Sequence, residues 1–235
     1  MLKMLKRESG VPFENMMLDF EQGMMKALRQ VFPGIQLRGC RFHLAQNWWR
    51  AIQRYGLATR YKNTKSAISK WLNKCFALPC LDEDIIRENF SDLAASAPLA
   101  CMPFVDYLDR WYMKSTSPFP PLMWASLSTR ETPATNNGME AFHRAFNDLV
   151  PSPHPNIRIF MDKLDVQSCK ATIYSNPTPK PKKIKLAPNF KDMHQLVREN
   201  KLDVSDFLSK VRAIEKKQKC KKRRKQPCNK KPRRK

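Results

Sequence analysis

Two carboxylates have positions that could serve chemistry. Asp19 ends a short apolar run, and a carboxylate at the end of a buried strand lies where α/β proteins hold ligands and metals. Glu140 falls in the first turn of a predicted helix. Either side chain could bind a hard cation such as Mg²⁺, which prefers oxygen ligands. The alternative is structural, with Asp19 capping the next helix and Glu140 completing a capping box with Asn137.

A cysteine and a histidine form the next candidate pair. Cys40 and His43 lie three residues apart across a predicted strand-to-helix turn, so both could reach one ion or each other. A structural zinc site takes four ligands, and Cys75 and Cys80 could supply a second, loosely spaced pair. The alternative is a cysteine buried as a small apolar residue beside a histidine that is satisfied by hydrogen bonds.

The C-terminal residues are strongly basic. The chain has 44 Lys and Arg against 21 Asp and Glu, a formal net charge of +23, and residues 216–235 hold 13 of the basic residues and no acid. Because the remainder is also basic, we predict DNA as the partner, although a solvated tail is the alternative. Short basic clusters favour nuclear import or phosphate contact. The predicted nucleic-acid-binding residues are Lys221, Lys222, Arg223, Arg224, Lys225, Lys230, Lys231, Arg233, Arg234 and Lys235.

The elements that must position these residues alternate near the N-terminus. Apolar runs at 16–19 and 35–42 predict two strands, with Gly39 suggesting a bulge in the second. Apolar residues at helical spacing over 24–32 and 44–55 predict a helix after each strand. This strand–helix–strand–helix order implies parallel pairing in an α/β sheet.

The rest of the chain divides into three further segments. Residues 1–57 hold the α/β pattern, and residues 58–130 show short helical stripes separated by prolines, as in an all-helical insertion. Residues 131–175 are again predicted helical. Residues 176–235 begin with a Pro/Lys linker, continue with a short amphipathic segment and end in the basic tail, which we expect to be disordered.

Composition excludes several classes of protein. The longest apolar run is far shorter than the roughly 18 residues that cross a bilayer, so no membrane span is expected. The first ten residues lack the apolar core of a secretory signal. Seven cysteines, an odd number, argue against a disulfide framework and favour a reducing compartment.

In combination and order, these motifs resemble one family. The pieces are Leu18-Asp19-Phe20-Glu21, then Phe32-Pro33, then the run from Arg38 to Gln46 that contains Cys40 and His43, and a Thr-Asn-Asn-x-x-Glu-x-x-His block at 135–143. Together they resemble the Mutator-like element (MULE) DDE transposases. The resemblance covers about residues 14–175.

The resemblance implies a metal-dependent DNA cleavage and strand transfer enzyme with an RNase H-like α/β core and a helical insertion. Asp19 would be the second catalytic acid and Glu140 the third, both binding Mg²⁺ or Mn²⁺ in a two-metal centre that works on DNA. Cys40 and His43 match the family's Cys-x-x-His motif, whose implied role is to shape the site and contact DNA. A nuclear location is implied, with no small-molecule substrate and no membrane; a homo-oligomer is left open.

One departure from the family concerns its first catalytic Asp. Only Glu8 and Glu14 precede Asp19 among acids, so the first strands of the sheet and their Asp are missing. We therefore predict a truncated RNase H-like core, a fragment that is inactive as given. The alternative is a non-catalytic, domesticated nuclear DNA-binding protein. A weaker alternative is a zinc-binding interaction domain, and zinc as a cofactor is disfavoured.

Overall fold

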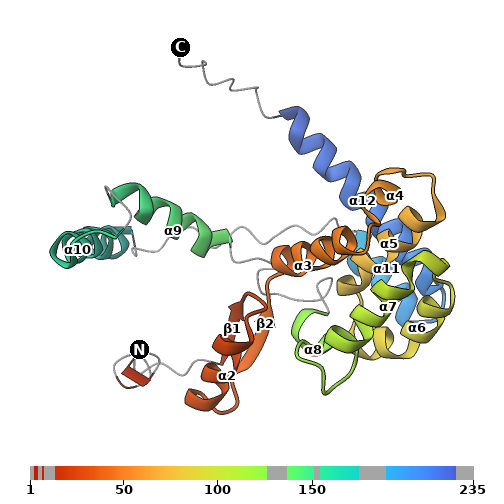
Figure 1. Cartoon of the computed structure of the whole chain (residues 1–235), viewed down its shortest axis with the longest axis horizontal. Coiled ribbons are helices and arrows are strands. Elements are labelled where there is room, and N and C mark those ends of the chain that lie inside the picture. The colour runs from red at the N-terminus through yellow and green to blue at the C-terminus, as the bar shows by residue number, and fades with distance from the viewer. Residues whose placement is uncertain are drawn as a thin grey trace.

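The fold is mostly helical, with one two-stranded parallel sheet (Figure 1). This computed structural model describes residues 14–125, 137–150, 154–174 and 189–225, together with residues 3, 4 and 7. The predicted fold class, a truncated RNase H-like α/β core, is therefore wrong. Most of the buried apolar side chains pack helix against helix, so the sheet is a small part of the core.

The N-terminal elements follow the predicted strand–helix–strand–helix order. They are β1 (Asn15–Leu18), α2 (Gln22–Val31), β2 (Gln36–Gly39) and α3 (Arg41–Arg54). The two strands pair in parallel, as expected for strands joined by a helical crossover. The backbone N–H of Cys40 donates to the carbonyl of Leu18 at 3.0 Å, so the two strands end together.

The glycine that ends β2 is explained by packing. The parallel register runs without interruption to the Leu18–Gly39 pair, so the bulge predicted near Gly39 is wrong. A Cβ added at Gly39 would lie 2.4 Å from the Phe20 ring, far inside van der Waals contact. Only glycine leaves room for this ring, which packs against Tyr112 and Phe119 of the helical body.

A helical body follows α3 directly. Its core is aromatic: the Trp48 ring of α3 lies 5.7 Å from both Tyr112 and Trp124, edge to face in each case. The bounds of its elements are α4 (Ala58–Lys62), α5 (Ala67–Ala77), η1 (Leu78–Cys80), α6 (Glu83–Ala95), η2 (Leu99–Cys101), α7 (Met102–Leu108), η3 (Asp109–Met113) and α8 (Pro121–Trp124).

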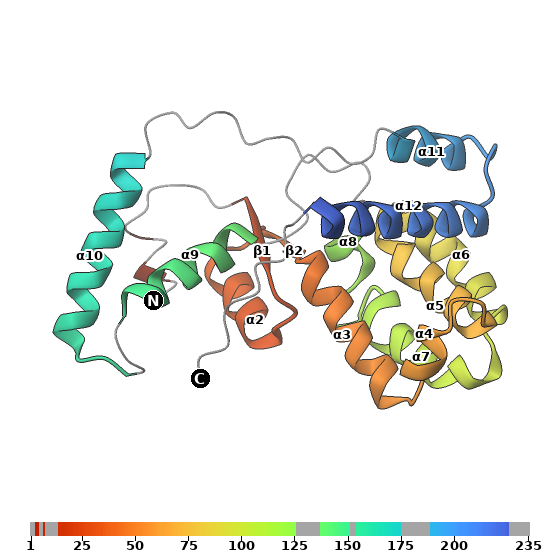
Figure 2. The same ribbon diagram turned by 90° about the horizontal axis from the view of Figure 1, so that it is seen from above.

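The C-terminal helices complete this body. They are α11 (Asn189–Arg198) and α12 (Val204–Lys225), and α12 lies along α5 (Figure 2). Phe207, Leu208 and Val211 of α12 are fully or almost fully buried. The Arg212 guanidinium lies 5.1 Å from the centre of the Phe76 ring, on α5. The segment predicted as a short amphipathic appendage is thus part of the hydrophobic core.

The prediction of a disordered basic tail is wrong for its first half. α12 continues through the basic run at 216–225, so the backbone that carries Lys221, Lys222, Arg223, Arg224 and Lys225 is helical. The other predicted DNA-binding residues lie outside the described part of the chain: Lys230, Lys231, Arg233, Arg234 and Lys235.

Two helices lie apart from the helical body in both views (Figures 1 and 2). They are α9 (Asn137–Leu149) and α10 (Ile157–Tyr174), which contact each other through an edge-to-face pair of Phe146 and Phe160 rings. Of the helices whose residues are described, none has both the length and the apolar character needed to cross a bilayer.

Candidate functional site

The predicted site residues gather where the two strands end. Asp19 directly follows β1, Cys40 directly follows β2, and His43 lies in the first turn of α3. Parallel strands joined by a crossover helix present their carboxyl ends at one edge of the sheet. Local chain geometry therefore brings Asp19 beside Cys40 and His43, although the helix α2 separates Asp19 from the other two in the sequence.

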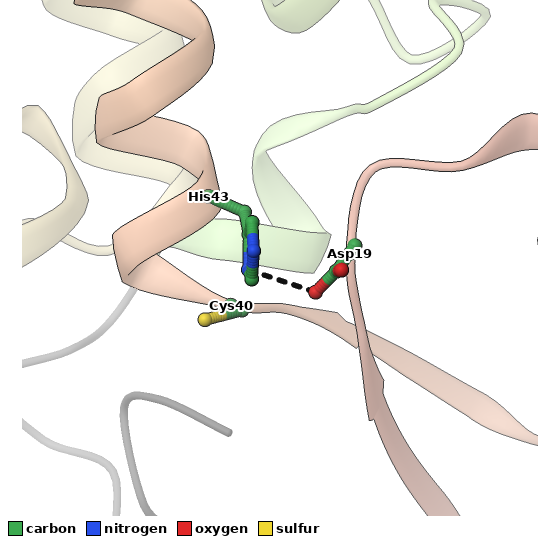
Figure 3. A group of neighbouring side chains, drawn as sticks. All are labelled: Asp19, Cys40 and His43. Atoms are coloured by element: carbon green, nitrogen blue, oxygen red, sulfur yellow. Dashed lines mark ion pairs between the residues drawn. The ribbon is translucent and has the colours of Figure 1, made fainter. Parts of the chain in front are cut away.

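The three side chains form a compact cluster of oxygen, sulfur and nitrogen donors. His43 Nδ1 lies 2.8 Å from Asp19 Oδ1. One ligand atom from each of Asp19, Cys40 and His43 falls within 4.8 Å of the others. Figure 3 shows the imidazole above Cys40 and beside the Asp19 carboxylate. Cys40 is fully buried, His43 is largely buried and Asp19 is half exposed, so the cluster opens to solvent on its carboxylate side.

Glu140 approaches the same imidazole from α9. Its Oε1 atom lies 4.0 Å from His43 Nε2, the nitrogen on the far side of the ring from Nδ1. The two predicted acids, from opposite halves of the chain, are thus placed on either side of one histidine. All three residues are candidates from the sequence alone, but the position of His43 between the carboxylates was not predicted.

The second cysteine pair does not join this cluster. Among the described residues, the group that could hold a metal consists of Asp19, Cys40 and His43, without Cys75 or Cys80. Both of these cysteines are buried in the helical body. Burial, with a smaller contribution from Cys101, raises the pKa of the Cys75 thiol well above its usual value. The Cys75 side chain therefore packs as a neutral, small apolar group.

The donor set does not fit the Mg²⁺ or Mn²⁺ centre that the family resemblance implies. A hard cation prefers an all-oxygen environment, usually carboxylates supplemented by water and substrate phosphates. Here the His43 imidazole contacts Asp19 and also faces Glu140. The donor set therefore contains the His43 nitrogen and the Cys40 sulfur as well as carboxylate oxygens. The residues at this site therefore do not form a binding site for a pair of hard cations.

A second charged cluster was not predicted from the sequence. Asp82, just before α6, is 6% exposed and accepts a hydrogen bond from Arg198 Nε of α11 at 2.9 Å. His194 of α11 is 2% exposed, with Nε2 3.3 Å from the same carboxylate. This cluster joins α11 to the start of α6 and is distant in sequence from the strand ends. Asp82 and Arg198 are 116 residues apart, so no local motif could reveal their pairing.

No protein-family model matches the chain, and neither a curated protein nor a solved structure matches it.

Proposed function

We propose that this chain is related to the MULE-type DDE transposases, binds DNA and contributes the Asp19–His43–Glu140 cluster to a cleavage site. The observation that carries the proposal is the convergence of the three residues. The three residues belong to separate blocks of sequence, and the fold places Asp19 and Glu140 beside the imidazole of His43.

In this proposal, the residues position DNA and one another. The Asp19 carboxylate holds the Nδ1 side of the His43 ring, while Glu140 faces its Nε2 side. The half-exposed carboxylate makes the open side of the cluster accessible to a nucleic-acid backbone. Basic side chains, rather than these acids, supply the affinity for the phosphates.

A second candidate, a non-catalytic nuclear DNA-binding protein, is favoured by the construction of α12. Arg212 donates hydrogen bonds from Nε to the Asn73 amide oxygen at 3.1 Å and from its guanidinium to the Tyr61 hydroxyl at 3.2 Å. These contacts fix the helix to the body just before its basic run begins. A helix held in this way carries its basic run on a backbone that is anchored to the body, and this arrangement requires no catalytic group.

DNA affinity tests both candidates. We expect the chain to bind a duplex with an affinity that falls steeply between 50 and 200 mM salt, as phosphate contacts require. Replacing all five residues of 221–225 by Gln should reduce the slope of log affinity against log salt by up to about 4.5, since each phosphate contact contributes about 0.9. Fluorescence anisotropy over a salt series measures this slope. An unchanged slope and affinity would refute the role assigned to α12.

Plasmid nicking tests the transposase candidate. In that proposal, any metal-dependent nicking should be lost in both Asp19→Asn and Glu140→Gln. Asp148→Asn is the matched control, because Asp148 is an exposed acid on the same helix as Glu140. Nicking that survives both substitutions would overturn the assignment. Nicking that depends on both residues would favour the transposase candidate, whereas DNA binding without nicking fits either candidate, because the chain is expected to be inactive as given.

A further inference from the structure

The cluster at the strand ends has the donor chemistry of a transition-metal site. We propose that Asp19, Cys40 and His43 bind one Zn²⁺ ion as three protein ligands. Carboxylate oxygen, thiolate sulfur and imidazole nitrogen are the ligands that Zn²⁺ takes in proteins, whereas Mg²⁺ takes oxygen alone. The three donor atoms already lie within 4.8 Å of one another, close enough for one ion to be placed among them.

The contact between His43 Nδ1 and Asp19 supports the metal site. His43 Nδ1 is buried and makes no hydrogen bond, even though the carboxylate oxygen is only 2.8 Å away. A buried nitrogen without a hydrogen bond is costly, and its contact with Asp19 is an ion pair without hydrogen-bond geometry, so an ion between the two groups would give this nitrogen a directed bond. Tetrahedral zinc with bonds of about 2.0–2.1 Å holds a nitrogen and an oxygen ligand roughly 3.3 Å apart. A small rotation of the exposed Asp19 side chain provides that separation.

Burial orders the ligands around the ion. The Cys40 side chain has no exposed surface, whereas 51% of the Asp19 side chain is exposed. The sulfur therefore lies on the protein side of the ion and the carboxylate on the solvent side. Three protein ligands leave the fourth position of a tetrahedral ion to water, which is the pattern of open rather than closed, purely structural zinc sites.

Glu140 fits the role of an outer partner of the histidine. Metal-bound histidines commonly donate their second ring N–H to a carboxylate, which fixes the ring orientation. Glu140 Oε1, at 4.0 Å from His43 Nε2, lies on that side of the ring. It would orient the histidine without touching the ion. The zinc site does not depend on the proposed DNA function, because the metal is measured without DNA.

The test is metal content and selectivity of the purified full chain. The chain is loaded with ZnCl₂, dialysed against metal-free buffer that contains excess MgCl₂, and analysed by elemental mass spectrometry. We expect one zinc per chain. Loading with Co²⁺ should give the ultraviolet absorption band of a thiolate–cobalt bond, together with visible bands of tetrahedral intensity.

Variants assign the ligands. His43→Gln and Asp19→Asn, both at partly exposed positions, should each lower zinc affinity at least tenfold. Cys40→Ser should remove the thiolate–cobalt band. Cys169→Ser is the matched control, because Cys169 is exposed on α10, and it should keep both the zinc and the band. Glu140→Gln should keep the one-to-one stoichiometry.

Three outcomes overturn the inference. One is a chain that retains no zinc in the presence of Mg²⁺. Another is zinc that is retained at full affinity in both His43→Gln and Asp19→Asn. The third is a thiolate–cobalt band that persists in Cys40→Ser, which would place the ion at another cysteine. If the unchanged chain retains no zinc but still binds DNA, this site is refuted and the proposed function stands.

Discussion

Phe207→Ala should destabilise the entire helical body, because α12 is part of its core. The Phe207 side chain has no exposed surface, and its ring lies 6.3 Å from that of His194 on α11. Truncating a fully buried Phe to Ala costs about 3–5 kcal/mol, through lost apolar contact and the cavity that remains. A domain has a free energy of unfolding of about 5–15 kcal/mol, so this loss is a large share.

Urea denaturation followed by tryptophan fluorescence measures the effect. Trp48, Trp71 and Trp124 are buried in the helical body, so their emission reports its unfolding. Lys210→Ala is the matched control, because Lys210 lies on the same helix with an exposed side chain, and it should leave the midpoint unchanged. If Phe207→Ala lowered the unfolding free energy by less than about 1 kcal/mol, the docking of α12 would be refuted.

Two further predictions concern stability. Burial lowers the pKa of His194, so the unfolded chain binds its proton more readily; stability should be full above about pH 6.5 and fall as the pH drops through the lowered folded-state pKa. His194→Gln should flatten this acid-side loss in denaturation curves recorded between pH 5 and 8, and an unchanged pH profile would contradict the account. Gly39→Ala should lower the unfolding free energy by about 1–3 kcal/mol, because its Cβ would meet the Phe20 ring at 2.4 Å. A thermal midpoint equal to that of the unchanged chain would show that the ring can move freely.

Sequence periodicity was informative about local structure. Apolar residues at helical spacing predicted α2 and α3, and the residues concerned are buried, Met25 and Leu28 in one helix and Leu44, Trp48 and Ile52 in the other. The parallel pairing of β1 and β2 also followed from the order of elements. Such patterns are visible because each element must turn one face toward a core, whatever that core is made of.

The extent of the sheet could not be predicted in the same way. A parallel strand pair is compatible with a large α/β sheet or with a two-stranded addition to a helical body, because local periodicity is the same in both. The difference is decided by what covers the sheet. Here Phe20, two residues after β1, packs on Tyr112 and Phe119, so in the described residues the helical body rather than a further strand lies against this end of the sheet.

Long-range charge pairs were equally hidden. Asp82 and Arg198 are an ordinary acid and an ordinary base in sequence, and only the docking of α11 on the start of α6 makes them partners. The C-terminal segment was predicted to be amphipathic, but its docking in the core was not predicted. Phe207, Leu208 and Val211 follow helical spacing, but the charged run after them favoured an appendage over a core helix.

The candidate site depends both on local chain geometry and on a long-range approach of α9. Asp19, Cys40 and His43 are placed by one local unit, the β1–α2–β2–α3 crossover, whereas Glu140 arrives on a helix that lies apart from the helical body. A ligand set held within one local unit has a geometry that does not depend on the position of α9. Binding of the ion and approach of Glu140 are therefore separable properties: displacing α9 should alter the orientation of the histidine while leaving the three donors in place.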